Sequence, residues 1–232
     1  MKTVFSLGSN MGDPFAHLRD AVRLIAETPG IHDVVVSPVY VTAPIGGVEQ
    51  DDFLNLVVVA TSDLPPSVLL ERAHVIEEAH GRDHTIPNGP RTLDVDLIRV
   101  GDETVTTDEL TLPHPRAHER AFVLVPWRDA DPEAELPGYG RIADLVASFD
   151  ADELADAVTR DSRQIAVAGV TGAGDWDEGQ AAEAGGHGAC HPSGMTTGDL
   201  AAAVTLKATS LRPIGRSSSW RPCAGPPWGG LR

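Results

Sequence analysis

Asn88-Gly-Pro-Arg-Thr-Leu-Asp-Val-Asp-Leu97 is the stretch that decides the fold, because an apolar strand here carries two acidic side chains. Side chains alternate between the two faces of a strand, so Asp94 and Asp96 are expected on one face, about 6.6 Å apart. This spacing suits one or two hard cations that take oxygen ligands. Arg91, just upstream, provides a planar fork of donors for a phosphate. The same short pattern also fits an exposed strand face with solvated acids.

The composition favours a cytoplasmic protein with one sizeable core. The chain has 232 residues and a formal net charge of −16, which argues against nucleic acid or an anionic membrane as a partner. Its two cysteines, Cys190 and Cys223, lie far downstream, so we expect no disulfide framework and a reducing compartment. The N-terminus reaches a turn at Gly8 too soon for a signal peptide, and no apolar run is long enough to span a bilayer.

Hydrophobic periodicity predicts the order strand, helix, strand, strand, helix, strand up to residue 100. Strands are expected at 3–7, 31–41, 56–60 and 94–100, with helices that open at Pro14 and at Pro65-Pro66-Ser67 and end at Gly30 and Gly81. Pro38 implies an edge or a bulge in the second strand. This order is that of an α+β, ferredoxin-like core with a mostly antiparallel sheet and helices on one face.

Further along, the pattern weakens and then disappears. Residues 122–125 should start a packed helix that Pro126 permits only in its first turn or interrupts, and 142–146 and 154–158 suit short closing helices. From about residue 169 the chain is rich in glycine, alanine, serine and proline. We therefore divide it into a folded domain at residues 1–168 and a mostly disordered tail at residues 169–232.

Two motifs within the tail resemble binding sites but are incomplete. Gly169-Val170-Thr171-Gly172-Ala173-Gly174 hints at a glycine-rich phosphate loop, yet it lacks the lysine and the spacing of such loops. The trio of His187, Cys190 and His191 falls short of the four ligands that a structural metal site needs. We assign neither motif a function.

Two other clusters in the folded domain point to ligands. Between residues 113 and 122 an otherwise acidic chain gathers His114, Arg116, His118 and Arg120, which suits a phosphate cradle or a solvated basic patch. Upstream, Asp52-Phe53-Leu54-Asn55 places an aromatic ring and an amide close together. That pair fits a flat heterocycle, but a single phenylalanine such as Phe53 is equally consistent with ordinary packing in the core.

Four separated motifs together resemble the 6-hydroxymethyl-7,8-dihydropterin pyrophosphokinase family of folate biosynthesis. They are Leu7-Gly8-Ser9-Asn10, Asp52-Phe53-Leu54-Asn55, the segment from Gly89 to Asp96, and Pro113-His114-Pro115-Arg116 with Arg120-Ala121-Phe122. The resemblance runs from the first strand to about Val158 and keeps the motifs in the family's order. It implies transfer of the β,γ-pyrophosphoryl group of ATP to the hydroxymethyl oxygen of the pterin, with release of AMP.

The resemblance also implies roles for individual residues. Asp94 and Asp96 would hold two Mg²⁺ ions. The residues facing ATP and its phosphates would be Glu77, Arg82, Arg91, His114, Arg116 and Arg120, of which Arg82, Arg91 and His114 are also counted as catalytic with the two aspartates. The pterin site would comprise Gly8, Thr42, Ala43, Pro44, Ile45, Phe53, Asn55 and Phe122, with the two phenylalanines stacked on the ring. We expect a monomer.

The sequence departs from the family at Phe53, where relatives often carry tyrosine, and in the loop 82–90. There His84 and Asn88 stand in the region where relatives often have a second basic residue and a tryptophan, so we expect closure of this loop over ATP to use different contacts. Two other classes also fit strand aspartates on a ferredoxin-like sheet. A polymerase-palm nucleotidyl transferase would need a basic channel, and a non-catalytic nucleotide-binding module would not need both acids.

Overall fold

The computed structural model describes residues 1–44, 50–81, 89–168 and 170–172 of the chain. The first part contains β1 (Lys2–Ser9), α1 (Pro14–Ala26), β2 (Ile31–Val36), β3 (Tyr40–Thr42), β4 (Phe53–Ser62), α2 (Pro66–Ala79) and β5 (Asp94–Val100). The second part contains β6 (Val105–Thr106), β7 (Thr111–Leu112), the 3-10 turn η1 (Ala117–Glu119), α3 (Ala121–Ala130), β8 (Glu135–Leu136), β9 (Gly140–Arg141), α4 (Ile142–Ala147), α5 (Ala151–Ala157), β10 (Val158–Arg160) and β11 (Thr171–Gly172).

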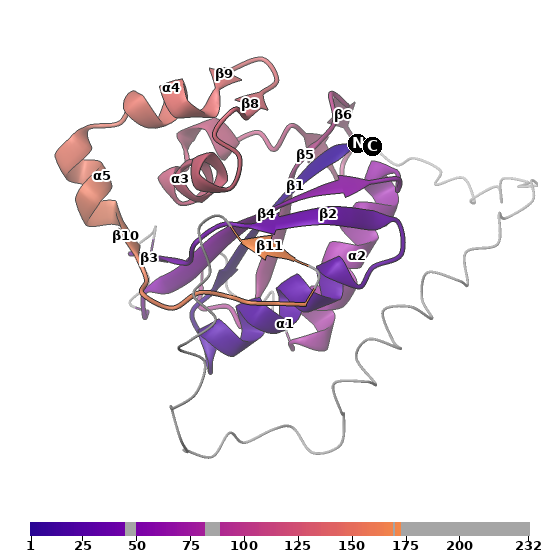
Figure 1. The fold of residues 1–232 in the computed structure, drawn as a ribbon, viewed down its shortest axis with the longest axis horizontal. Helices are drawn as coiled ribbons and strands as arrows, with labels where there is room; N and C mark the ends of the chain where they lie inside the picture. The colour runs from indigo at the N-terminus through magenta and orange to yellow at the C-terminus, as the bar shows by residue number, and fades with distance from the viewer. Residues whose placement is uncertain (45–49, 82–88, 169, 173–232) are drawn as a thin grey trace, which may run out of the picture.

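The predicted ferredoxin-like core is confirmed. The strands β2, β4, β1 and β5 lie side by side in that order, and each neighbouring pair is antiparallel. Within this unit α1 and α2 pack on the same face of the sheet, as expected (Figure 1). The start of α1 also follows the sequence signal, because the Asp13 side chain accepts the Ala16 N–H at 3.1 Å and Pro14 occupies the first turn.

The second predicted strand is broken in two at Pro38, where a bulge or an edge was expected. β2 pairs with the far half of β4, while β3 pairs with its near end, where Tyr40 faces Asn55 and Thr42 faces Phe53. Between them the Ser37 N–H donates to the Val57 carbonyl at 2.9 Å, and the Ser37 hydroxyl accepts the Val57 N–H at 2.9 Å. The side chain of Ser37 thus replaces a backbone acceptor across the break.

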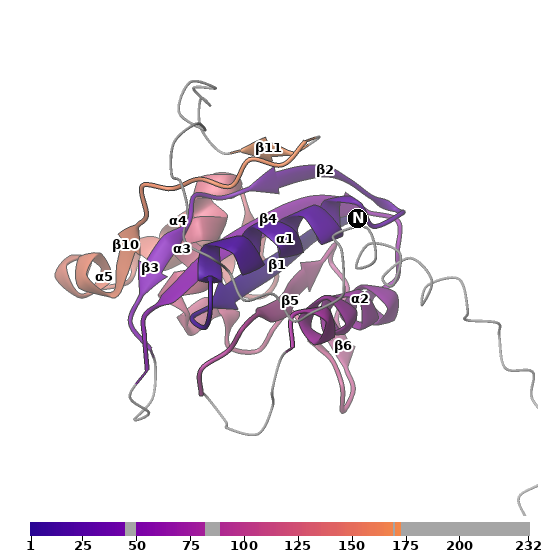
Figure 2. The same cartoon turned by 90° about the horizontal axis from the view of Figure 1, so that it is seen from below.

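Strict alternation along the strands gives the sheet two different faces. Phe5 and Leu7 of β1 belong to the core beneath α1 and α2, whereas Val4 belongs to a second core beneath α3 and α4. Figure 2 shows α1 in front of the sheet and α3 and α4 behind it. The helix α3 continues through Pro126 to Ala130, so the expected interruption is wrong. Its flanking residues on both sides of the proline are buried in this second core, and that packing outweighs one missing backbone hydrogen bond.

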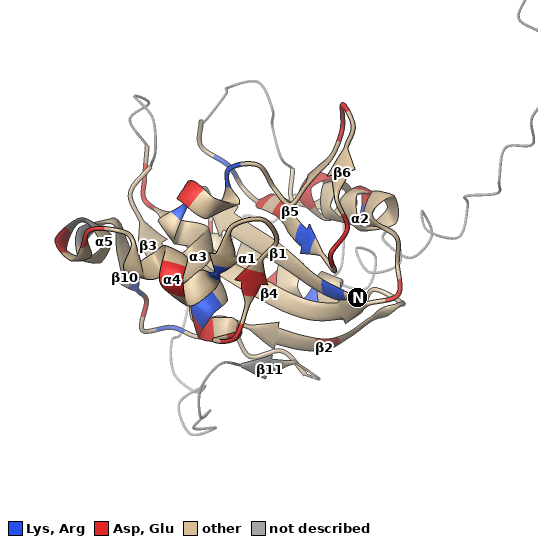
Figure 3. Cartoon of the chain, turned by 90° about the horizontal axis from the view of Figure 1, so that it is seen from above, with Lys and Arg blue, Asp and Glu red and all other residues tan. Residues whose placement is uncertain are grey.

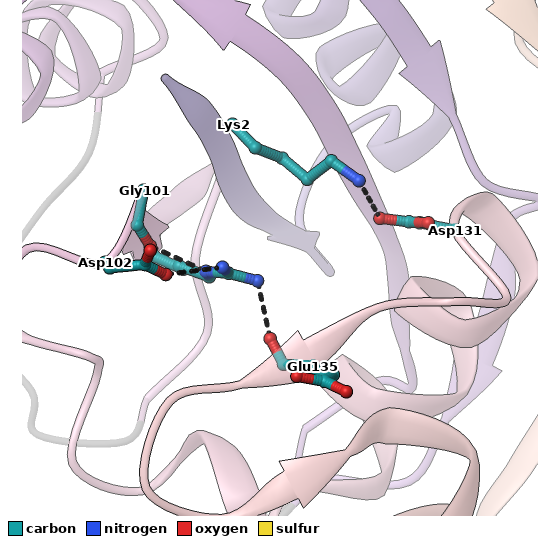
Figure 4. Close-up of polar contacts among 6 residues, drawn as sticks. Lys2, Gly101, Asp102, Asp131 and Glu135 are labelled. Atoms are coloured by element: carbon teal, nitrogen blue, oxygen red, sulfur yellow. Dashed lines mark hydrogen bonds and ion pairs between the residues drawn. The ribbon is translucent and has the colours of Figure 1, made fainter.

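Polar contacts fasten the segment that follows α3 to the far end of the sheet. In Figure 4 the Lys2 ammonium lies 2.8 Å from the Asp131 carboxylate. Nearby, the Arg99 guanidinium donates to the carbonyl oxygens of Gly101 at 2.7 Å and Glu135 at 2.6 Å. These bonds tie β1 and β5 to the turn after α3 and to β8, and so fix the helix over only one end of its sheet face.

The residues that the structure describes extend past the expected domain boundary at residue 168, to residue 172. β10 pairs with the free side of β3, Ile165 is buried in the core beneath α1, and β11 runs parallel to β2 (Figure 1). Thr171 and Gly172 therefore lie in a strand. The rest of the glycine-rich motif, the His187, Cys190 and His191 group and the tail from residue 173 fall outside the described residues. Among the helices that the structure does describe, none is both long and apolar enough to cross a membrane.

Candidate active site

The candidate site lies on the sheet face that α3 covers only in part. On this face the apolar residues Val4, Val57 and Ile98 pack beneath α3. Two residues away from these positions, toward the uncovered end of the sheet, the same face carries the polar residues Ser6, Asn55 and Asp96. Cross-strand pairing brings Asn55, Gly8 and Asp94 into one row and sets Ser6 beside Asp96 in the next. The alternation predicted for Asp94 and Asp96 thus places both on this face.

Gly8 is required by its neighbour rather than by its own backbone conformation. A Cβ atom at this position would lie 2.7 Å from the Asn55 Oδ1, which is closer than a carbon and an oxygen normally approach. The Asn55 side chain is held in place from the other side, because its Nδ2 donates to the Thr42 Oγ1 at 2.7 Å and the residue is buried. The absent side chain of Gly8 therefore makes room for a fixed amide.

The two aspartates each pair with an arginine from a different part of the chain. Arg91 donates to Asp94 from three residues upstream, and Arg120, just before α3, donates to the Asp96 Oδ2 at 3.1 Å. The four side chains are between 19% and 33% exposed, so water reaches them. The opposite charges of the two carboxylates and the two guanidinium groups offset one another, so the four groups can lie close together. The same groups can bind an anion and its counter-ions.

The donor set also suits magnesium. Within the described residues, no cluster of three or more His, Cys, Asp or Glu side chains is placed to hold a metal ion. Mg²⁺ usually binds through one or two carboxylates and completes its shell with water and substrate phosphates, so it needs no larger protein cage. Asp94 and Asp96 at the wall of an open cavity therefore fit this ion.

His114 is oriented by its own backbone and by the next turn. Its N–H donates to the Ile98 carbonyl at 2.9 Å, and its ring Nδ1 accepts the Arg116 N–H at 3.2 Å. Burial lowers the pKa of the ring below its usual value; Asp96 acts against this shift, and Arg120 adds to it. The lowered pKa favours the neutral ring, and the bond accepted at Nδ1 places the ring proton on Nε2.

Most of the residues predicted for the site surround one cavity of about 440 Å³. Its lining is Ser6, Gly8, Thr42, Ala43, Phe53, Asn55, Gly89, Arg91, Asp94, Asp96, His114, Arg116, Arg120 and Phe122. Ser6 was not predicted, although its position two residues before Gly8 on the same strand face is a signal that sequence offers. The guanidinium of Arg120 also lies 5.5 Å from the centre of the Phe122 ring, a cation–π distance.

A second cavity of about 330 Å³ meets the first at Asp96 and His114, which line both. It is bounded by α2, β5 and the turn before β7, with Leu70, His74 and Leu110 among its walls. Sequence reasoning did not anticipate this cavity, because its walls come from three segments that meet only in the fold.

Two of the predicted residues that the structure describes do not line the first cavity. Glu77 lines the second one, where it is buried and accepts the Val95 N–H at 2.7 Å, so it also fastens α2 to β5. Pro44 follows the wall residue Ala43 but is not itself part of the lining. Ile45, in the segment 45–49, and Arg82, in the segment 82–88, lie outside the described residues. His84 and Asn88 belong to the second of these segments and are also outside the described residues.

The charge around the site differs in sign from the net charge of the chain. Figure 3 shows acidic positions on α4, α5 and around β6. In the first cavity, Arg91, Arg116 and Arg120 converge with His114. The cavity therefore combines three arginines with two acids inside a chain whose net charge is −16, and this local cationic cluster is where an anionic ligand is attracted.

The fold and the site define a class of protein: a ferredoxin-like α+β domain whose carboxylates and arginines are arranged for transfer of a phosphate group. Comparison with known proteins agrees with this. The family described as 7,8-dihydro-6-hydroxymethylpterin-pyrophosphokinase matches residues 4–132. The chain belongs to this family and is an enzyme of pyrophosphoryl transfer.

Similar proteins bear the same family name. A 2-amino-4-hydroxy-6-hydroxymethyldihydropteridine pyrophosphokinase of Mycobacterium leprae is 48% identical over 151 residues, which cover 60% of this chain and 77% of that one. An enzyme with the same name in Mycobacterium tuberculosis is 43% identical over 149 residues, which cover 60% of this chain and 77% of that one. The enzyme so named in Bacillus subtilis is 41% identical over 121 residues, or 52% of this chain and 72% of that one.

A solved structure supports the fold alone. A crystal structure of Plasmodium falciparum HPPK-DHPS with SDX-DHP matches with a TM-score of 0.54 at 15% sequence identity. The match covers 68% of this chain but only 47% of the Plasmodium chain, so the present chain spans about half the length of that protein.

Proposed function

We propose that this chain transfers the β,γ-pyrophosphoryl group of ATP to the hydroxymethyl oxygen of 6-hydroxymethyl-7,8-dihydropterin, a step of folate biosynthesis that leaves AMP. The observation that carries the proposal is the position of Asp96 and His114, which line two cavities at once. A reaction between two substrates needs both reacting groups at one point. The junction of the cavities is that point, and phosphate-binding side chains surround it.

The first cavity holds the pterin in this proposal. Phe53 and Phe122 provide flat apolar surfaces for the ring, and Asn55 provides the polar edge. Because the Asn55 amide nitrogen is committed to Thr42, its Oδ1 is the acceptor presented beside Gly8. A ring with N–H groups along one edge matches such an acceptor, whereas a ring that offers only acceptors there leaves it unpaired, at a cost in affinity.

The second cavity then accommodates the nucleoside end of ATP, with its triphosphate extended toward the first. Arg91, Arg116 and Arg120 bind phosphate oxygens, and arginine forks are well suited to this because two parallel N–H groups can meet two oxygens. His114 stands at the junction as a neutral donor through Nε2, so it can bond a bridging or terminal oxygen without adding charge. Glu77 supports this wall through its bond to the backbone of β5.

Asp94 and Asp96 would hold two magnesium ions beside the triphosphate. When bound, these ions would neutralise charge that develops on the phosphate oxygens. The residues of the chain supply the rest: they align the hydroxymethyl group with the phosphorus at the junction of the two cavities. Arg91 and Arg120 already stand against the two carboxylates, so the charges needed for both phosphate and cation are in place before the substrates arrive.

The nucleotide product tests the proposal. Purified protein is incubated with ATP, Mg²⁺ and 6-hydroxymethyl-7,8-dihydropterin, and nucleotides are separated by ion-exchange chromatography. AMP should form in step with the pterin diphosphate. Asp96→Asn should lower the rate by at least about 100-fold, as expected for loss of a charged group at the reacting centre. Asp102→Asn, at a carboxylate that is 90% exposed beside β5, is the matched control and should leave the rate unchanged. Formation of ADP would refute the proposal.

We also propose that the protein acts as a monomer in the cytoplasm, without nucleic acid or a membrane as partner. The support is the acidic composition and the sequence positions of both cysteines, which come after the folded domain. Sedimentation velocity at micromolar protein should show a single species of about the chain mass, and a species of twice that mass would contradict the proposal.

A further inference from the structure

A buried tyrosine outside the cavity links the two elements that carry opposite walls of the proposed pterin site. Tyr40 of β3 is 5% exposed, and its hydroxyl donates a hydrogen bond to the Asp129 carboxylate on α3. Burial, together with this bond and the charge of Asp129, raises the pKa of Tyr40 above its usual value. The other oxygen of Asp129 accepts from the Arg128 guanidinium at 2.9 Å and 3.1 Å, so the carboxylate is held in one orientation.

On the strand side, the position of Tyr40 is fixed independently of α3. β3 lies between β4 and β10, with Tyr40 paired to Asn55 on one side and to Arg160 on the other. The Asp161 N–H adds a bond of 2.8 Å to the Val39 carbonyl. Two residues after Tyr40, Thr42 accepts the bond that orients the Asn55 amide. β3, which orients the Asn55 amide of β4 through Thr42, is therefore held by hydrogen bonds on both of its sides.

On the helix side, the position of α3 decides where Phe122 lies. Phe122 sits in the first turn and Asp129 seven residues later, a spacing that puts both on one side of the helix. Arg120, which precedes the helix, is held by Asp96 at 3.1 Å. The hydrogen bond at Asp129 fixes the other end. With both ends tied, α3 has little freedom to rotate or slide, and Phe122 keeps its distance from Asn55.

We propose that Tyr40 and Asp129 are positioning residues for the pterin, which set the gap between the aromatic wall on α3 and the amide edge on β4. Neither residue belongs to the described lining of the first cavity, so each acts through the element that carries it. The proposal rests on the assignment of this cavity to the pterin. It requires a specific signature: weaker pterin binding with little change at the nucleotide.

The test compares two single-oxygen deletions in the full chain. Tyr40→Phe removes the hydroxyl and keeps the ring. Tyr139→Phe is the matched control, since these are the two tyrosines of the chain and Tyr139 is 47% exposed. Tyr40→Phe should raise the KM for the pterin by about 3- to 10-fold, the factor expected from one lost hydrogen bond. Its kcat and its KM for ATP should stay within about 2-fold, and Tyr139→Phe should resemble the wild type.

Further variants separate positioning from simple loss of stability. Val146→Ala removes packing from the same core as Tyr40, at a residue outside the lining of the first cavity, and should lower the melting temperature without the selective change in pterin KM. Asp129→Asn still offers an oxygen to Tyr40, so this variant should keep a pterin KM close to that of the wild type. Asp129→Ala offers none and should behave like Tyr40→Phe. Unchanged pterin KM in Tyr40→Phe, or equal increases for both substrates, would overturn the inference.

Calorimetry distinguishes failure of this inference from failure of the proposed function. The affinity of each variant for 6-hydroxymethyl-7,8-dihydropterin is measured directly, without turnover. If the wild type binds the pterin and yields no AMP, the proposed reaction is wrong, and the loss of affinity in Tyr40→Phe still decides the positioning role. If the wild type makes AMP and Tyr40→Phe binds the pterin as well as it does, only the positioning role is wrong.

Discussion

Replacement of Gly8 by alanine should damage the site through Asn55 alone, and its sign can be worked out from the structure. The new Cβ would lie 2.7 Å from the Asn55 Oδ1, so the buried amide must move by several tenths of an ångström. The movement strains or breaks the 2.7 Å bond from its Nδ2 to Thr42. Loss of a buried hydrogen bond that leaves its partners unpaired costs about 1–3 kcal/mol.

A second effect opposes this cost. In the interior of a strand, alanine is more favourable than glycine by roughly 0.5–1 kcal/mol, because the unfolded chain has less freedom to lose. The balance for Gly8→Ala is a loss of up to about 2.5 kcal/mol in the free energy of unfolding. The pterin should also bind at least about 10-fold more weakly, since its acceptor at Asn55 has moved.

A double-mutant cycle isolates the cause. In an Asn55→Ala background the clash is absent, so Gly8→Ala should stabilise the protein by about 0.5–1 kcal/mol instead of destabilising it. Urea unfolding of the wild type, the two single variants and the double variant measures the effect of Gly8→Ala in both backgrounds. Calorimetry measures the pterin affinity of the wild type and of Gly8→Ala, both of which retain Asn55. Destabilisation of equal size in both backgrounds would refute the reasoning, because the cost would then not arise at Asn55.

Three further predictions concern the broken strand, acid stability and the phosphate site. Ser37→Ala leaves a buried N–H of β4 without its 2.9 Å acceptor and should cost about 1–3 kcal/mol by urea unfolding. Burial and the facing His80 lower the pKa of His17, so protons bind the unfolded chain first and stability is lost as pH falls below about 6.5. His17→Asn should weaken that loss, whereas His32→Asn, at an exposed histidine, should not. Arg91→Lys should raise the KM for ATP by about 10-fold, since lysine lacks the planar fork.

The features that sequence predicted are those set by local rules. The alternation of a strand puts Asp94 and Asp96 on one face, and Asp13 with Pro14 marks the start of α1. At Pro38 sequence predicted an edge or a bulge, and the structure has a break there, because proline lacks an N–H. Each of these depends on neighbours within a few residues, so a single sequence contains enough information to predict it.

The features that sequence did not predict depend on register and packing between distant segments. The clash that makes Gly8 necessary comes from Asn55, which faces it only because β1 and β4 pair in one particular register. Likewise, α3 passes through Pro126 because buried neighbours hold it. The contact of Tyr40 with Asp129 and the second cavity bring together residues far apart in the chain. Local propensity carries no information about such pairings.

The measurement that tests the central claim most directly follows the β-phosphorus of ATP. ATP that carries a radioactive label at the β position is incubated with the full chain, Mg²⁺ and 6-hydroxymethyl-7,8-dihydropterin. Transfer of a pyrophosphoryl group predicts that the label appears in the pterin product and that the remaining nucleotide is unlabelled AMP. Label retained in ADP, with a pterin monophosphate as product, would contradict the account.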